Sequence, residues 1–196
     1  MKKAYIVAPA LALMLITSAC QQRKVTRIDP SQQTDISGRW NDTDSKMVSE
    51  EMISDVLGRP WLKEFTEKMG RKPVVIVGRI RNNTTEPDIQ PETFIKDIEK
   101  NFINTATVTV VQAKEGRDDL RAEREDQQTF ATEESRKKWG KEKGADFMLN
   151  GVINSNIDEY KKDRVITYKI NLELIDLESN IKVWIGDKEI KKHIRN

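Results

Sequence analysis

The alternation of apolar and polar side chains in residues 164–176 constrains the fold more than any other feature of this sequence. Side chains of a β-strand point to opposite faces in turn, so this pattern predicts a strand with one buried face and one wet or lightly covered face. The apolar positions are Ile166, Tyr168, Ile170, Leu172 and Leu174. Turn residues at 158–163 and 178–180 separate this strand from two further predicted strands, at about 146–157 and 180–190. The chain is therefore expected to close with two successive hairpins.

The middle of the chain carries further helix and strand patterns. Helical spacing of apolar residues and β-branched runs predict helices at about 46–57, 60–69 and 91–104 and strands at about 74–81 and 107–112. The first helix is expected to be capped by Asp44 or Ser45. Lysines that fit an edge strand, where they discourage further pairing, are Lys188, Lys191 and Lys192.

Residues 114–143 hold 9 basic and 9 acidic residues and few large apolar ones. This stretch is expected to contain two exposed helical pieces, the second from near Thr132 to Gly144, with charges that match the helix dipole. The order of elements predicts an α+β fold, with a mixed sheet of about five strands flanked by helices. Residues 38–196 are expected to form this single domain.

The amino terminus has the pattern of a secretory signal peptide. Two lysines precede an apolar stretch that is too short to span a bilayer, and small residues then lead into Cys20, the one cysteine of the chain. Residues 1–19 are predicted to be the signal peptide. Residues 20–37 are predicted to be a lipidated cysteine followed by a short flexible tether.

The end of the signal peptide resembles a bacterial lipobox, although Thr17 stands where leucine is usual. We expect acyl chains on Cys20 to anchor the protein in the membrane. The alternative is an ordinary cleaved signal that leaves Cys20 as a free thiol. Gln22, in place of aspartate, is compatible with sorting to the outer membrane, so the domain is expected in the periplasm. Retention in the inner membrane or, in a Gram-positive host, at the cell surface is the alternative.

Few residues of the chain suit catalysis or cofactor binding. One cysteine and one histidine are too few for a disulfide framework or a usual zinc site, and 34 basic against 32 acidic residues give no strong field for nucleic acid. His193 lies near the end of the chain, and no phosphate loop or nucleophile elbow occurs. Neighbouring carboxylates, which could suit a glycosidase, are better explained as solvated surface. The acidic residues near Asp42 are better explained as a helix cap than as a calcium site. We therefore expect no catalytic residue, metal, cofactor or small-molecule substrate.

Trp40 differs from the other tryptophans because it lies in a polar stretch ahead of the first predicted helix. It either plugs the edge of the domain or is an exposed contact residue, since large aromatic side chains often anchor protein interfaces. Both interpretations stay open at the level of the sequence.

Several segments together resemble the LpoB family, outer-membrane lipoproteins that activate penicillin-binding proteins. Besides the lipobox cysteine, the matching segments are Ser37-Gly38-Arg39-Trp40-Asn41-Asp42-Thr43-Asp44-Ser45, Gly78-Arg79-Ile80-Arg81-Asn82-Asn83-Thr84, Gly144-Ala145-Asp146 and Lys182-Val183-Trp184-Ile185-Gly186. The resemblance implies a fold similar to the amino-terminal domain of TolB. Well-known members carry a long proline-rich linker after the cysteine, whereas the tether here is short. Within the matching segments, the candidate partner-binding residues are Trp40, Arg79, Arg81 and Asn82.

The resemblance also implies a role without catalysis. The leading hypothesis is a lipid-anchored periplasmic regulator that binds a class A penicillin-binding protein and stimulates its glycan polymerisation. The alternatives are a structural or assembly lipoprotein of the curli-secretion type and, more weakly, a peptidoglycan hydrolase. The expected partners are the synthase and, through the acyl chains on Cys20, the membrane, with no nucleic acid.

Overall fold

The computed structural model describes residues 25–30 and 32–195, except for the side chain of Glu115. The predicted signal peptide and Cys20 lie outside the described residues. The chain divides into two units at Gln32 and Gln33. Residues 25–30 and 32 of the first unit are exposed and hold no helix or strand. All helices and strands in the described part of the chain belong to the second unit.

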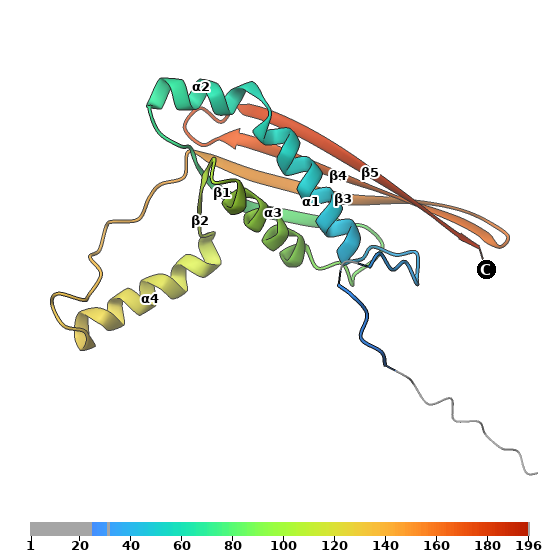
Figure 1. Cartoon of the computed structure of the whole chain (residues 1–196), viewed down its shortest axis with the longest axis horizontal. Helices are drawn as coiled ribbons and strands as arrows, with labels where there is room; N and C mark the ends of the chain where they lie inside the picture. Colours follow the sequence, from blue (N-terminus) through green and yellow to red (C-terminus); the bar gives the residue numbers. More distant parts are fainter. Residues whose placement is uncertain (1–24, 31, 196) are drawn as a thin grey trace, which may run out of the picture. The chain divides into compact units, whose positions relative to one another are not determined.

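The second unit contains helices and strands in the predicted α+β arrangement (Figure 1). The helices are α1 (Asp42–Leu57), α2 (Pro60–Met69), α3 (Pro91–Thr105) and α4 (Lys114–Phe130). The strands are β1 (Val74–Asn83), β2 (Thr109–Val111), β3 (Phe147–Tyr160), β4 (Asp163–Asp176) and β5 (Lys182–Arg195). The strands form one mixed sheet in the order β2-β1-β3-β4-β5, which confirms the predicted fold class.

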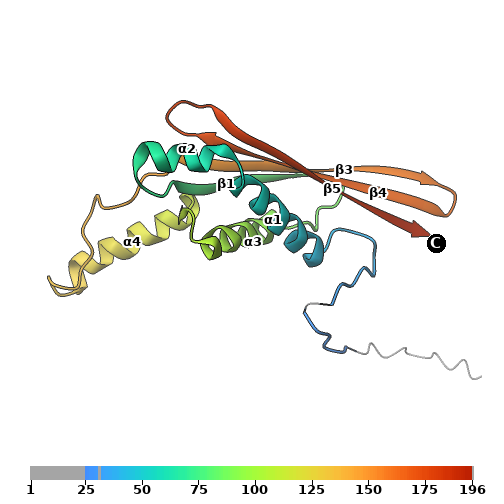
Figure 2. The same cartoon turned by 45° about the horizontal axis from the view of Figure 1, so that its top comes forward.

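The sheet combines two kinds of pairing. β1 runs parallel to both β2 and β3, with α3 and α4 in the connections between these strands. β3, β4 and β5 are antiparallel neighbours, as the two predicted hairpins require. Figures 1 and 2 show α1 and α3 side by side on one face of the sheet, where they bury its apolar side chains.

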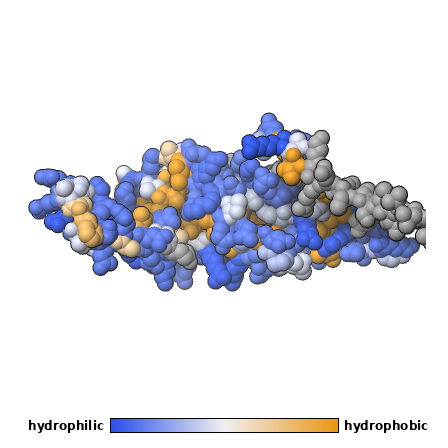
Figure 3. Space-filling view, turned by 90° about the horizontal axis from the view of Figure 1, so that it is seen from below, coloured by the Kyte–Doolittle hydropathy of each residue, from blue (hydrophilic) through white to orange (hydrophobic). Residues whose placement is uncertain are grey.

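The core confirms that the alternating apolar residues of β4 form a buried face. Every one of the five apolar positions of β4 is 1% exposed or less. They pack with the inner faces of α1 and α3, through Val48, Ile53, Val56, Phe94, Ile98 and Phe102. On the outside, hydrophobic residues form separate patches in a mainly hydrophilic surface, as the view from below shows (Figure 3).

Several predictions from sequence were wrong, including that of β2, which spans Thr109–Val111 instead of 107–112. α1 begins at Asp42 because Asn41, rather than Asp44 or Ser45, caps it: the Asn41 side chain accepts from the Asp44 amide, and the Asp44 carboxylate accepts from the Asn41 amide. The second helical piece, from Thr132 to Gly144, is absent, and this stretch consists of turns and irregular backbone. Its tryptophan is half exposed, so no buried apolar face holds the stretch in a helix.

The last strand is longer than the sequence predicts. β5 continues to Arg195 and pairs with β4 over its whole length, so His193 lies opposite Val165 within the sheet rather than at a frayed end. Its ring Nε2 lies 3.0 Å from Oδ1 of Asp163, and both side chains are exposed. The contact gives the histidine a partner across the strands.

Candidate functional site

Trp40 lies where the chain enters the domain, just before α1. Its ring makes edge-on contacts with Phe94 of α3, at a centroid distance of 6.2 Å, and with Tyr168 of β4, at 5.6 Å. The indole Nε1 donates to Oγ of Ser45 at 2.9 Å. These contacts make Trp40 a partly buried plug at the edge of the core. A role in partner binding stays a prediction.

A buried carboxylate organises the loop beside Trp40. Glu86 is 7% exposed, and its Oε1 accepts from the Tyr168 hydroxyl at 2.6 Å. The same hydroxyl accepts from the Trp40 amide at 3.1 Å, and this amide also lies 3.4 Å from Oε2 of Glu86. Burial, together with the bond to Glu86, raises the pKa of Tyr168. The phenol therefore stays neutral at physiological pH and keeps its donated hydrogen bond.

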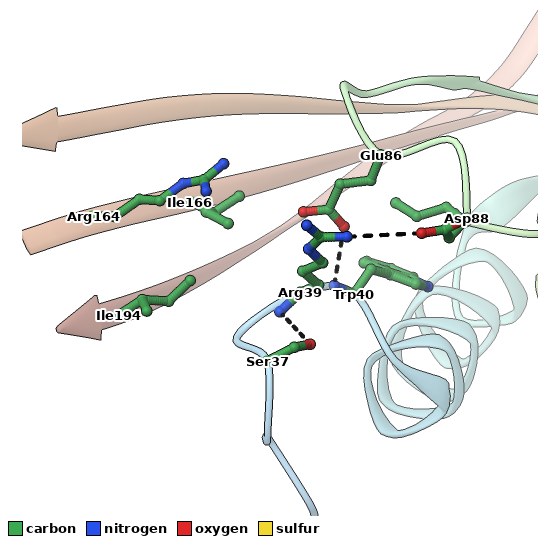
Figure 4. A pocket seen from close by; sticks show the side chains of 9 residues that line it. Ser37, Arg39, Trp40, Glu86, Asp88, Arg164, Ile166 and Ile194 are labelled. Atoms are coloured by element: carbon green, nitrogen blue, oxygen red, sulfur yellow. Dashed lines mark hydrogen bonds and ion pairs between the residues drawn. The ribbon is translucent and has the colours of Figure 1, made fainter. Parts of the chain in front are cut away.

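A polar pocket of about 560 Å³ opens next to this cluster (Figure 4). Arg39 and Asp88 lie on one side of it, 3.7 Å apart and both well exposed, so their attraction is weak. The ends of β4 and β5 form the opposite side, with Arg164, Ile166 and Ile194. The pocket offers charged and apolar surface for a contact, and it holds no nucleophile with an adjacent base.

Lys192 fastens the segment ahead of α1 to β5. Its Nζ donates to Oδ1 of Asp35 and to Oδ2 of Asp44, both at 2.6 Å, and to the carbonyl of Arg39 at 2.9 Å. The Lys192 side chain is 10% exposed, and its hydrogen bond lowers the pKa of Asp35. Lys192 therefore has an inward, structural position instead of the predicted exposed one. Contacts with the domain therefore begin within the predicted tether, since the Thr34 carbonyl accepts from Asn41 and Asp35 accepts from Lys192.

The other candidate partner-binding residues lie on β1. Arg79 and Arg81 are exposed, the first within the register shift of β1 against β3 between Val77 and Ile80 and the second just after it. Asn82 has a structural position, because its Nδ2 donates to the Glu86 carbonyl at 2.8 Å and its Oδ1 accepts from the following loop. Trp40 and Asn82 thus meet at the Glu86 loop.

The two arginines line different hollows from Trp40. They border a groove along β1 and a smaller pocket over β3 and β4, whereas Trp40 borders the pocket of Figure 4. The four candidates therefore do not form one site. Asn82 contacts the Glu86 loop beside Trp40 and also lines the β1 groove with Arg79 and Arg81, whereas Trp40 lies outside that groove.

The structure adds Glu86, Tyr168 and Lys192 to the candidate residues. Tyr168 shows a usable signal in the sequence, because a tyrosine in the buried phase of a strand needs a partner for its hydroxyl. Glu86 gives no such signal within its polar loop. In the described part of the chain, no three His, Cys, Asp or Glu residues are placed to hold a metal ion, and no helix is long and apolar enough to cross a membrane.

The chain was compared with solved structures and with curated proteins. The C-terminal domain of LpoB from Escherichia coli is 15% identical, over 75% of this chain and 98% of that domain, with a TM-score of 0.48. The same domain from Salmonella enterica is 13% identical over the same shares, with a TM-score of 0.46. Lipoprotein GNA1162 from Neisseria meningitidis is 15% identical, over 62% of this chain and 83% of its own, with a TM-score of 0.39. No curated protein matches the sequence significantly.

The decisive comparison is with a family model. The model described as peptidoglycan-synthase activator LpoB matches residues 44–190, which include α1 to α4 except the first two residues of α1, and nearly the whole sheet. This match confirms the resemblance seen in the sequence. The chain belongs to the LpoB family of peptidoglycan-synthase activators.

Proposed function

We propose that this protein is a lipid-anchored periplasmic regulator that binds a class A penicillin-binding protein and stimulates its glycan polymerisation. The match to the family of peptidoglycan-synthase activators over residues 44–190 carries the proposal. The proposal goes beyond the family match in three respects, namely the acyl anchor on Cys20, the outer-membrane location and the class of the synthase. The lipobox-like sequence around Cys20 supports the anchor.

The hydrogen bonds from Lys192 to the segment ahead of α1, here called the Lys192 latch, limit how far this regulator could reach towards its partner. Because Asp35 is held to β5, at most 15 residues of chain separate the anchoring cysteine from the domain. Such a segment spans at most about 50 Å when fully extended. A domain on this tether stays near the membrane of its anchor, so the synthase must extend towards it.

Binding to the synthase tests the proposal first. The full lipoprotein, purified in detergent, is titrated with the class A penicillin-binding proteins of its own organism, and complex formation is followed by analytical ultracentrifugation. We expect a complex at micromolar concentrations or below. A folded lipoprotein that shows no binding at these concentrations would contradict the proposal. A large homo-oligomer without synthase binding would favour the assembly role instead.

The anchor has its own test. Cells that express the chain are labelled with an alkyne fatty acid, and wild type is compared with Cys20→Ala and with Thr17→Leu, which restores the usual lipobox residue. We expect labelling in wild type and Thr17→Leu and none in Cys20→Ala. Equal labelling of Cys20→Ala would place the acyl chain elsewhere and contradict this part of the proposal.

A further inference from the structure

One edge of β1 is open over most of its length. β2 pairs with β1 only from Val74 to Ile76, whereas β3 pairs with the other edge of β1 as far as Asn83. In the described part of the chain, no strand accompanies Val77–Asn83 on the β2 side. At about 3.3 Å per residue, these seven residues present roughly 23 Å of strand edge. Alternate backbone N–H and C=O groups of this edge are available to a further strand.

The open edge borders a groove of about 1060 Å³. The amino-terminal part of α3 forms one wall, and the two residues between β2 and α4 form the other with the beginning of α4. Apolar surface from Ile76, Ile95 and Met148 lies among the polar lining residues. The groove therefore has the parts that an added strand needs, namely a backbone edge and surfaces for its side chains.

The charges along the groove are unbalanced. Its cations are Arg79, Arg81, Lys96, Lys114 and Arg117, and its acids are Glu92 and Glu99. Lys96 pairs with Glu99 at 2.6 Å. Among the described residues, the other four cations have no carboxylate within ion-pair distance. The Nε of Arg117 is also buried without a hydrogen-bond partner in the described part of the chain.

We infer that the groove accepts an extended acidic segment of the synthase, which adds to β1 as a strand in continuation of β2. This inference rests on the proposed function and assigns its contact surface. The backbone edge selects an extended peptide, because a lipid headgroup cannot use the alternating donors and acceptors of a strand. The unpaired cations select carboxylates in that peptide and supply the attraction that steers association.

Hydrogen–deuterium exchange on the full lipoprotein, with and without saturating class A synthase, tests the inference. We expect the synthase to slow exchange of the amides within 77–83 by about tenfold or more, as a new strand ladder requires. The charge-reversal variant Arg79→Glu/Arg81→Glu should raise the Kd of the complex by about tenfold at physiological salt. The control variant Lys161→Glu/Lys162→Glu changes the same charge at the exposed tip of the β3–β4 hairpin and should leave the Kd within about twofold.

The outcomes separate the inference from the proposed function. Binding without slower exchange in 77–83, or an equal loss of affinity in both variants, overturns the groove as the contact surface and leaves the proposed function standing. Absence of synthase binding by a folded wild-type chain overturns both. A third outcome is that Arg79→Glu/Arg81→Glu loses binding to vesicles of anionic lipid but binds the synthase as wild type does. This result would assign the cations to a membrane surface and overturn the inference.

Discussion

Replacement of Trp40 by alanine should reveal how strongly the entry segment is built into the fold. The indole makes two edge-on aromatic contacts, each worth about 0.5–1.5 kcal/mol, and one hydrogen bond to Ser45, worth about 0.5–1.5 kcal/mol. Because the ring is partly buried, the total should fall below the largest losses seen for core tryptophans. We therefore expect Trp40→Ala to lower the free energy of unfolding by roughly 3 kcal/mol, or the melting temperature by about 6–12 °C.

Urea unfolding followed by circular dichroism measures this loss, with Trp139→Ala as the matched control. Trp139 is 51% exposed in the irregular stretch after α4, so the same substitution there should cost less than about 0.5 kcal/mol. Trp40→Phe keeps a ring but loses the bond to Ser45, and about 1 kcal/mol is expected. Equal losses for Trp40→Ala and Trp139→Ala would refute the assignment of Trp40 as a plug of the core.

Three further substitutions test other parts of the fold. Lys192→Met should destabilise the domain by about 3 kcal/mol in urea unfolding, because it leaves the buried Asp44 without its cation. The control Lys191→Met, at an exposed position, should cost less than about 0.5 kcal/mol, and similar losses for both would contradict the structural role of Lys192. Gly151→Ala places a Cβ 2.7 Å from a backbone oxygen of β4 and should cost about 1–3 kcal/mol, whereas Gly144→Ala meets no atom within 4 Å and should be near neutral; thermal melting that shows no difference would refute this close approach. Two hydrogen bonds from Arg71, at 2.7 Å each, lower the pKa of Asp146, so the stability that this carboxylate contributes is present at neutral pH and is lost as the pH falls below about 4. Asp146→Asn should therefore be less stable than wild type at pH 7 and should lose less stability on acidification. If urea unfolding shows the same loss of stability with acid in both proteins, this reasoning is contradicted.

The predictions from sequence succeeded where the information is local and regular. The alternation in 164–176 identified β4 and its buried face, since a period of two leaves one register compatible with a covered sheet. The helix cap was predicted in the right place but at the wrong residue, because Asn41, Asp44 and Ser45 can all cap a helix and tertiary contacts decide among them.

Other features depended on contacts between distant parts of the chain. Lys192 lies between Ile190 and Ile194 in the inward phase of β5, so its burial was visible in the alternation once the strand was extended beyond residue 190. The role of Glu86 depends on a hydroxyl 82 positions away, and no local pattern signals it. The open edge of β1 likewise follows from the shortness of β2, whose length the sequence pattern overestimated.

Glycan polymerisation by the purified synthase tests the central claim most directly. The full lipoprotein is titrated into a class A penicillin-binding protein of its own organism in detergent, with fluorescent lipid-linked disaccharide as substrate, while the rate of chain formation is recorded. We predict a saturable rise in that rate, with half-saturation at the Kd measured by sedimentation. A rate that stays unchanged at concentrations where the complex is fully formed would contradict the claim.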